Sequence, residues 1–277
     1  MNMERSKAQL SSEVLDGRLV LPQAEWAMAN LEKSAKELFG NVFETSEFSQ
    51  GLEKAQAFLK CRPERRQLKR FKEGFAGFLF EQLAYQLTRR FLEERAESDT
   101  VVLSPGETFD LYQIVNPDRP VFSQNFGFNR RVEGLTIPDG IVFRRDGEET
   151  MVVSVCEYTL STRIVGRMGY RKRNQSEHYE TGRVVDIFLL GEADCQNALG
   201  KYLNNRYPGF FRRLSFDPEK FRVIYVRPKK ATSRNFDNSS NPNRLLLRAP
   251  LTREEFRIAL EGIVSDMRRS FSLKLEK

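Results

Sequence analysis

The strongest constraint on the fold of this chain is a pair of short apolar runs separated by a charged turn. The runs are 137–142 and 152–159, and the turn carries Asp-Gly at 146–147. Val, Ile and Phe favour strands, and Asp-Gly favours a tight reversal, so we expect a β-hairpin here. Each run contains one acid, Asp139 in the first and Glu157 in the second. The hairpin would therefore place two carboxylates on neighbouring strands.

Two acids on buried neighbouring strands need a compensating positive charge. Buried acids are rare unless they are paired or bind a cation, and adjacent carboxylates raise each other's pKa. A hard divalent ion bound through oxygen meets this need, so the hairpin predicts a site for Mg²⁺ or Mn²⁺. The alternative is that Pro138-Asp139-Gly140 forms an ordinary turn and that Glu157 emerges into solvent at a strand end.

The composition narrows the class of protein. With 277 residues, 40% of them hydrophobic, the chain can bury a substantial core. It has no apolar run of about 18 residues, and its opening residues lack the apolar core of a secretory signal, so we expect no membrane association. Its three cysteines form no Cys-x-x-Cys, so neither a zinc ribbon nor a disulfide framework is indicated, and a cytoplasmic location is expected. No Walker or Gly-x-Gly-x-x-Gly sequence points to a nucleotide cofactor.

The basic character of the chain favours a polyanionic partner. The formal net charge is +7, which suggests nucleic acid before membrane. Basic residues also gather in short stretches that we expect to hold DNA, most simply duplex DNA, through its phosphates. A solvated charged face is the alternative for any one stretch. The predicted DNA-binding residues are Arg65, Arg66, Lys69, Arg70, Arg130, Arg131, Arg171, Arg173, Lys229 and Lys230.

Hydrophobic periodicity predicts an α/β domain with a mixed sheet. We expect helical segments at 22–60, 73–94, 165–181 and from Thr252, where Thr252 and Glu255 have capping-box spacing. Strands are expected at 101–103, 109–112, in the hairpin at 136–159, and at 221–226. Residues 184–190 fit either a buried strand or a helix start, and the turn-rich stretch 231–244 suggests a loop. Arg62-Pro63 separates an N-terminal helical segment, 1–65, from the main domain, 66–277.

A third acid, Glu81, lies on the predicted helix 73–94. Small residues, including Gly74, Gly77 and Ala84, share its helical face. Small side chains around one acid allow a ligand or a neighbouring backbone to approach it closely. The alternative is an ordinary exposed helix glutamate.

These acids resemble a known family pattern. Pro138-Asp139, then seventeen residues, then Glu157-Tyr158-Thr159 resembles the core motif of the PD-(D/E)XK nuclease superfamily. The resemblance implies that Asp139 and Glu157 ligate the metal ion.

Residues on either side of this motif extend the resemblance. Glu81 resembles the family's first-helix glutamate, and Gln175-x-x-x-Tyr179 resembles an element of the RecB-like branch. The resemblance covers about 73–227 and implies a restriction-endonuclease-like core with the order α-β-β-β-α-β, preceded by the N-terminal helical segment. It also implies that Glu81 assists the metal ion and that Gln175 and Tyr179 position the substrate backbone or a lysine.

One position departs from the family pattern. The third motif residue is usually lysine, and here it is Thr159, which supplies no positive charge. Either the site is inactive or a cation comes from elsewhere. Lys172, on one helical face with Gln175 and Tyr179, is the first candidate. Arg163 and Arg167 are its rivals.

The resemblance implies a Mg²⁺- or Mn²⁺-dependent DNA endonuclease that hydrolyses phosphodiester bonds, in a mobile-element, restriction or phage-defence setting. A structure-selective or RNA-cleaving relative is a second enzymatic alternative. A catalytically inactive nuclease-fold module that binds nucleic acid or serves as an interaction subunit is the alternative from another class. Since cutting both strands usually needs two sites, a homodimer or a partner subunit is also expected. The single histidine, His178, excludes a multi-histidine metal site.

Overall fold

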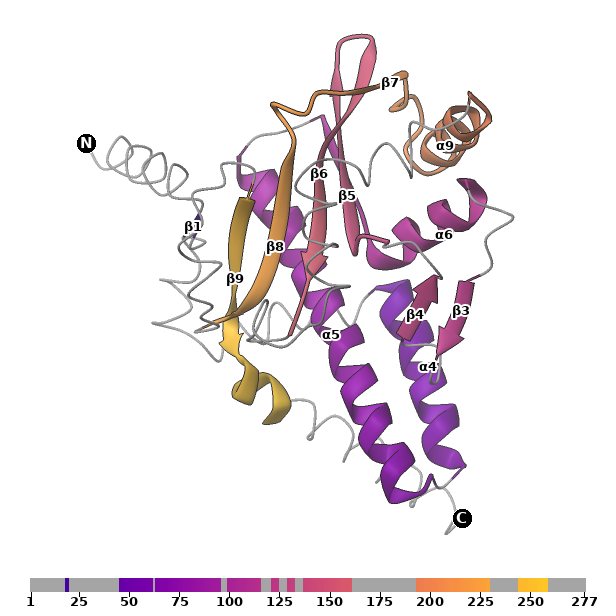
Figure 1. Ribbon diagram of the computed structural model, residues 1–277, viewed down its shortest axis with the longest axis vertical. Coiled ribbons are helices and arrows are strands. Elements are labelled where there is room, and N and C mark those ends of the chain that lie inside the picture. Colours follow the sequence, from indigo (N-terminus) through magenta and orange to yellow (C-terminus); the bar gives the residue numbers. More distant parts are fainter. Residues whose placement is uncertain are drawn as a thin grey trace, which may run out of the picture.

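The computed structural model describes nine stretches of the chain, which together form a layered α/β structure (Figure 1). None of the described helices combines the length and the apolar character that a membrane crossing requires. The described stretches are 18–19, 45–61, 63–95, 99–115, 121–124, 129–132, 137–160, 193–229 and 244–258.

The centre of the fold is a mixed seven-stranded sheet, as the alternation of helices and strands predicted. Its main path runs β1-β9-β8-β6-β5-β2, and β7 pairs with β6 beside that path. The β2-β5 and β5-β6 pairs are antiparallel, whereas β8 and β9 continue parallel to β6. The strands are β1 (Arg18–Leu19), β2 (Thr100–Leu103), β5 (Gly140–Asp146), β6 (Glu149–Tyr158), β7 (Arg213–Phe216), β8 (Arg222–Lys229) and β9 (Arg244–Thr252). A separate antiparallel pair consists of β3 (Val121–Gln124) and β4 (Asn129–Val132).

Helices cover both faces of this sheet. On one face lies the 30-residue helix α5 (Arg65–Glu94), against which α4 (Ser46–Lys60) packs. On the other face lie α6 (Pro105–Val115) and α9 (Ala193–Arg206). Successive strand residues point to opposite faces, so they divide between two hydrophobic cores. Val142 and Cys156 join the core beneath α5, whereas Ile141 and Val155 join the core beneath α6 and α9.

The predicted hairpin is confirmed. β5 pairs with β6 in a register that aligns Gly140 with Cys156, and Gly147 takes a positive φ of 57° in the turn. The strand predicted at 221–226 is confirmed as β8, and the strand at 101–103 as β2. The Thr252–Glu255 capping box also forms, because each residue's backbone amide donates to the other's side chain.

Two predicted elements are wrong in type or extent. The stretch 109–112, expected as a strand, lies inside helix α6. A capping box explains this, because the Ser104 amide donates to Glu107 Oε2 at 2.9 Å and the Glu107 amide donates to Ser104 Oγ at 3.1 Å. Helix α5 begins at Arg65 rather than 73, because the Gln67 side chain accepts a hydrogen bond from the Glu64 amide at 2.9 Å.

Other expected elements are partly or wholly outside the described residues. Of the expected helical segment at 22–60, the described part is α4, which ends at Lys60 just before Arg62-Pro63. The helix expected at 165–181, the run at 184–190 and most of the loop at 231–244 lie outside the described residues. Helix α9 and strands β7 and β9 were not predicted.

Candidate active site

A cleft of about 190 Å³ lies where α4, α5, the start of α6 and the residues before β5 meet. Two of the predicted acids line it, Glu81 from α5 and Asp139 from the segment leading into β5. Glu47 and Lys54, both from α4, line the same cleft. The cleft, defined by Glu47, Lys54, Glu81 and Asp139, therefore gathers three carboxylates and one amine.

Asp139 is fixed by the hairpin that the sequence predicted. Its backbone amide donates to the Cys156 carbonyl at 2.9 Å, and its Oδ2 accepts a hydrogen bond from the Tyr158 amide at 2.6 Å. Both contacts come from β6, so the strand pairing itself orients the carboxylate. An aspartate that accepts a backbone hydrogen bond is held for ligation at its other lone pairs.

The core beside Asp139 is shielded from solvent. Cys156 and Tyr158 flank Glu157 on β6 and are buried against α5. Burial raises the pKa of the Cys156 thiol to about 12, and burial likewise raises the pKa of Tyr158. Both groups therefore stay protonated at neutral pH and form an uncharged wall behind Asp139.

Glu157 is close to Asp139 along the hairpin but does not line the cleft. The last aligned pair, Gly140 and Cys156, adjoins both acids, and Glu157 aligns with Tyr225 on β8. Within the described stretches, no three His, Cys, Asp or Glu side chains are grouped so that they could hold a metal ion. The fold thus places Glu81 and Asp139 in one cleft and Glu157 at its margin.

Thr159, the residue at the usual lysine position, adjoins a buried cation. Its amide donates to the Val226 carbonyl at 3.1 Å, so it lies beside the end of β8. The residue that follows Val226 is Arg227, whose exposed fraction is 1%. Nothing in the sequence indicated that Arg227 would be buried, because it lies among other basic residues that suggest an exposed surface.

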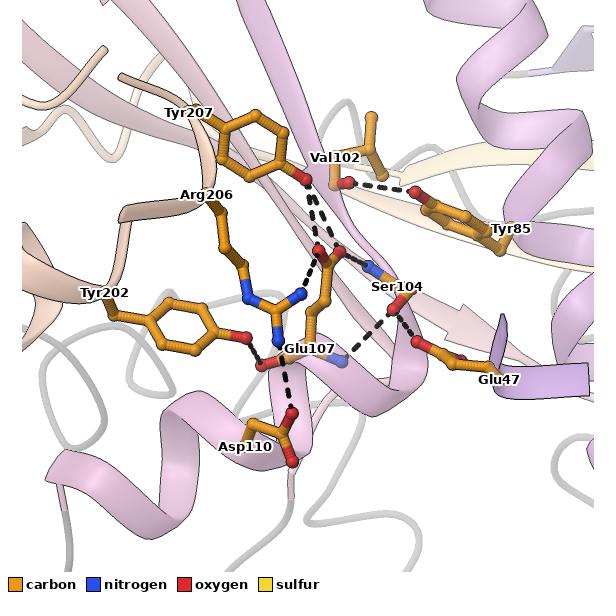
Figure 2. Close-up of polar contacts among 9 residues, drawn as sticks. All are labelled: Glu47, Tyr85, Val102, Ser104, Glu107, Asp110, Tyr202, Arg206 and Tyr207. Atoms are coloured by element: carbon orange, nitrogen blue, oxygen red, sulfur yellow. Dashed lines mark hydrogen bonds and ion pairs between the residues drawn. The ribbon is translucent and has the colours of Figure 1, made fainter. Parts of the chain in front are cut away.

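Glu47 is the cleft residue that sequence reasoning missed. It lies in the first turn of α4, which begins where Thr45 Oγ1 accepts a hydrogen bond from the Phe48 amide at 3.1 Å. Gln82 Nε2 donates to Glu47 Oε2 at 2.7 Å. The Ser104 hydroxyl donates to Glu47 Oε1, as Figure 2 shows. A Cβ at Gly106 would lie 2.5 Å from Glu47 Oε1, so any larger residue there would force this carboxylate to shift. The contacts are non-local, and nothing in the local sequence indicates them.

The polar network around Glu47 continues to the other face of the sheet (Figure 2). Glu107, at the start of α6, accepts a hydrogen bond from Tyr207 and forms an ion pair with Arg206 Nη1 at 3.0 Å. The Tyr202 hydroxyl donates to the Glu107 carbonyl at 3.0 Å, so α9 is tied to α6. Burial raises the pKa of Tyr85 to about 12, with Glu107 adding to the effect. These contacts fix α6 and therefore the floor of the cleft.

A second hollow, of about 1030 Å³, adjoins the first half of α5. Three of the predicted DNA-binding residues line it, and Lys72, Arg253 and Arg257 join them from α5 and from the helical residues 253–258. We call it the basic groove and define it by Arg65, Arg66, Lys69, Lys72, Arg253 and Arg257.

The remaining predicted residues are placed as follows. Arg70 is exposed on α5 but does not line the groove, and Lys229 is half-buried at the end of β8. Arg130 and Arg131 lie on β4. The residues that lie outside the described stretches are Arg163, Arg167, Arg171, Lys172, Arg173, Gln175, His178, Tyr179 and Lys230.

Comparison of the chain with protein-family models, with curated proteins and with solved structures found no match.

Proposed function

We propose that the protein is a metal-dependent nuclease that hydrolyses phosphodiester bonds in DNA, with the cleft as its active site. The observation that carries the proposal is the convergence of Asp139 and Glu81 on one cleft, from the hairpin and from the preceding helix. The element order also supports it. Helix α5 precedes three antiparallel strands, β2, β5 and β6, and a parallel strand, β8, follows. That order resembles the one expected for a restriction-endonuclease-like core, with α6, β3 and β4 inserted between β2 and β5.

The donor type of the cleft suits a hard divalent ion, because Glu47, Glu81 and Asp139 offer oxygen atoms, which are the ligands that Mg²⁺ and Mn²⁺ prefer. In the described residues these three side chains are not grouped closely enough to hold the ion as they stand, so binding would require them to move together. When bound, such an ion would lower the pKa of a water molecule and neutralise charge on the reacting phosphate. Asp139 is held for this role by the Tyr158 amide, and Glu157 would complete the ligand set from the margin of the cleft.

Two cations can balance the charge that gathers on the phosphate. Lys54 lines the cleft, and its flexible side chain would present an ammonium group to an anionic substrate. Lys172 remains the candidate implied by the family resemblance, with Gln175 and Tyr179 positioning the substrate backbone.

An inactive nucleic-acid-binding module is the second candidate. Thr159 at the usual lysine position favours it, because threonine brings no positive charge to the reacting phosphate. This candidate shares the basic surfaces of the first but predicts no cleavage.

The test is cleavage of plasmid, linear duplex and single-stranded DNA with Mg²⁺, Mn²⁺ or EDTA, using the full chain. We expect cleavage that requires the divalent ion and that falls about 100-fold or more in Asp139→Asn, because a neutral amide is a poor ligand. The matched control is Asp146→Asn, an exposed aspartate at the far end of β5, which should cleave like the wild type.

Two results would decide against the nuclease. No cleavage of any substrate, with binding that persists in EDTA, would favour the inactive module. Cleavage that is equally strong in Asp139→Asn would move the active site away from the cleft.

A further inference from the structure

The basic groove has two walls from distant parts of the sequence. One wall is the first half of α5, and the other is the pair of helical turns at 253–258 that follows β9. Figure 1 shows these turns beside α5, on the side away from α4. The Thr252–Glu255 capping box fixes the start of the second wall, and buried Phe256 anchors it against Phe80 of α5, with ring centroids 5.7 Å apart.

Among the described residues, few negative charges neutralise the positive charge of the groove. Arg257 pairs with Glu254 at 2.6 Å. The other five cations, Arg65, Arg66, Lys69, Lys72 and Arg253, make no ion pair within the part of the chain that the structure describes. Glu73 is the one acid among the lining residues. A hollow lined by charges of one sign focuses the field and attracts the opposite charge.

The cations are spaced regularly along α5, as a binding surface for a polyanion would be. Arg65, Lys69 and Lys72 recur about once per helical turn, a spacing of about 5.4 Å along the axis. A compact anion would contact only one or two of these positions. A chain with a regularly repeated negative charge can contact all of them, as a phosphodiester backbone does.

The floor of the groove is apolar. Its apolar lining residues are Leu68, Ala76, Leu160 and Phe256, and each of them is buried or half-buried. A duplex keeps its bases paired and offers mainly phosphates to a surface of this kind. An unpaired strand exposes base faces as well, so it can place phosphates on the rim and bases on the floor.

Within the part of the chain that the structure describes, the groove and the cleft share no lining residue, but they adjoin successive parts of α5. Glu73 and Gly77 line the groove, and Glu81, one turn further along the same face of α5, lines the cleft. Leu160, on the groove floor, follows the strand that carries Glu157.

We infer that the basic groove binds an unpaired strand of nucleic acid and guides it to the cleft. This deepens the proposed function, because it assigns a single-stranded substrate, or a substrate with an unpaired end, in place of the simple duplex. Delivery to the cleft rests on the proposed function, whereas strand binding in the groove does not.

The test is fluorescence anisotropy of the full chain in EDTA, with a labelled 20-nucleotide DNA strand and with the duplex of the same sequence. We expect the single strand to bind more tightly. Lys69→Glu combined with Arg253→Glu reverses one charge on each wall and should weaken strand binding about 10-fold or more. The control, Arg212→Glu combined with Arg213→Glu, makes the same charge change at exposed residues outside the groove and should weaken binding less than 2-fold.

A second variant tests the floor. Leu68→Gln keeps a side chain of similar size and leaves the charges of the groove unchanged, but it replaces an apolar lining group with a polar one. It should therefore weaken strand binding more than duplex binding. Circular dichroism checks that each variant is folded. For the wild type, the logarithm of the binding constant should fall linearly with the logarithm of salt concentration, by about 0.7 per phosphate contacted.

Several results would overturn the inference. They are equal or tighter binding of the duplex, equal losses in the groove and control variants, and a flat response to salt. Binding to vesicles of phosphatidylserine that the groove variant abolishes, with oligonucleotide binding unchanged, would assign the groove to a membrane surface instead.

The outcome is distinguishable from that of the nuclease test. Strand binding in the groove without cleavage would uphold this inference and reject the nuclease. Cleavage that Asp139→Asn abolishes, with strand binding insensitive to the groove variant, would do the reverse.

Discussion

The cleft and the basic groove adjoin successive parts of one helix and have opposite chemistry. The cleft gathers the carboxylates of Glu47, Glu81 and Asp139 around one lysine, whereas the groove gathers six cations around one acid. A polyanion would be held by the groove and repelled by the cleft unless a metal ion neutralised the carboxylates. The difference separates the surface that holds a substrate from the surface that can react with it, and α5 connects the two.

Helix α5, which lines both the cleft and the groove, gives the first test of this comparison and the largest expected effect. Phe75 is fully buried on α5 and stacks with Phe71 and Phe78, which support the groove end and the cleft end respectively. Phe75→Ala should lower the free energy of unfolding by about 3–5 kcal/mol, because it removes a buried ring and leaves a cavity. Urea denaturation followed by circular dichroism measures the change, and both strand binding and cleavage should weaken together.

The control is an exposed position on the same helix. Glu93→Ala removes a side chain that is 64% exposed and should change stability by less than about 0.5 kcal/mol. A Phe75→Ala protein that loses cleavage but keeps full strand binding would show that α5 does not couple the two surfaces.

The hairpin and the strands β2 and β8 could be predicted because their signals are local. Runs of Val, Ile and Phe on either side of Asp-Gly decide the β5-β6 hairpin within about 20 residues of sequence. Helix α6 was mistaken for a strand because Phe109 and Leu111 alternate with polar and aromatic neighbours. The deciding signal was also local: Ser104 and Glu107 have capping-box spacing, and Pro105 lies at the first helical position.

The cleft could be predicted only in part, because its second half is assembled by tertiary packing. Asp139 could be recognised because it is an acid at the start of an apolar strand, and Glu81 because small residues surround it on its helical face. Both line the cleft. Glu47 and Lys54 belong to a separate helix whose position depends on packing such as that of Phe48 against Phe78. No periodicity in α4 indicates which of its polar residues will face α5. The second wall of the groove, Arg253 and Arg257, was missed for the same reason.

A substitution at Glu47 would sharpen the comparison, because it should affect the cleft alone. Glu47 accepts hydrogen bonds from Ser104 and from Gln82, whose exposed fraction is only 1%. Glu47→Ala would leave the Gln82 amide buried without this acceptor and should cost about 1–3 kcal/mol of unfolding free energy. Cleavage should fall because a cleft carboxylate is lost, while strand binding in EDTA should be unchanged.

Glu53→Ala is the matched control, since Glu53 is an exposed glutamate on the same helix and does not line the cleft. Strand binding that weakens in Glu47→Ala as much as cleavage does would mean that cleft and groove are one surface.

The smallest expected effect concerns Cys156, one of the buried, uncharged side chains behind Asp139. The groove differs, because its charged side chains are mostly exposed to solvent. Burial raises the pKa of Cys156 from 9.0 to about 12, so the thiol keeps its proton in the folded protein while the unfolded chain releases it. The unfolded state then binds fewer protons, and the free energy of unfolding must fall as pH rises above 9 and through the folded pKa. For one group the slope is at most about 1.4 kcal/mol per pH unit.

Urea titrations under reducing conditions between pH 8 and 9.5 measure this slope for the wild type and for Cys156→Ala, and the difference between the two separates the thiol from the tyrosines, which ionise in the unfolded chain over an overlapping range. Cys156→Ala should flatten the decline, and Cys61→Ala, at an exposed cysteine, should leave it intact. A slope as steep in Cys156→Ala as in the wild type would assign the loss to other buried groups and would contradict a raised pKa for this thiol.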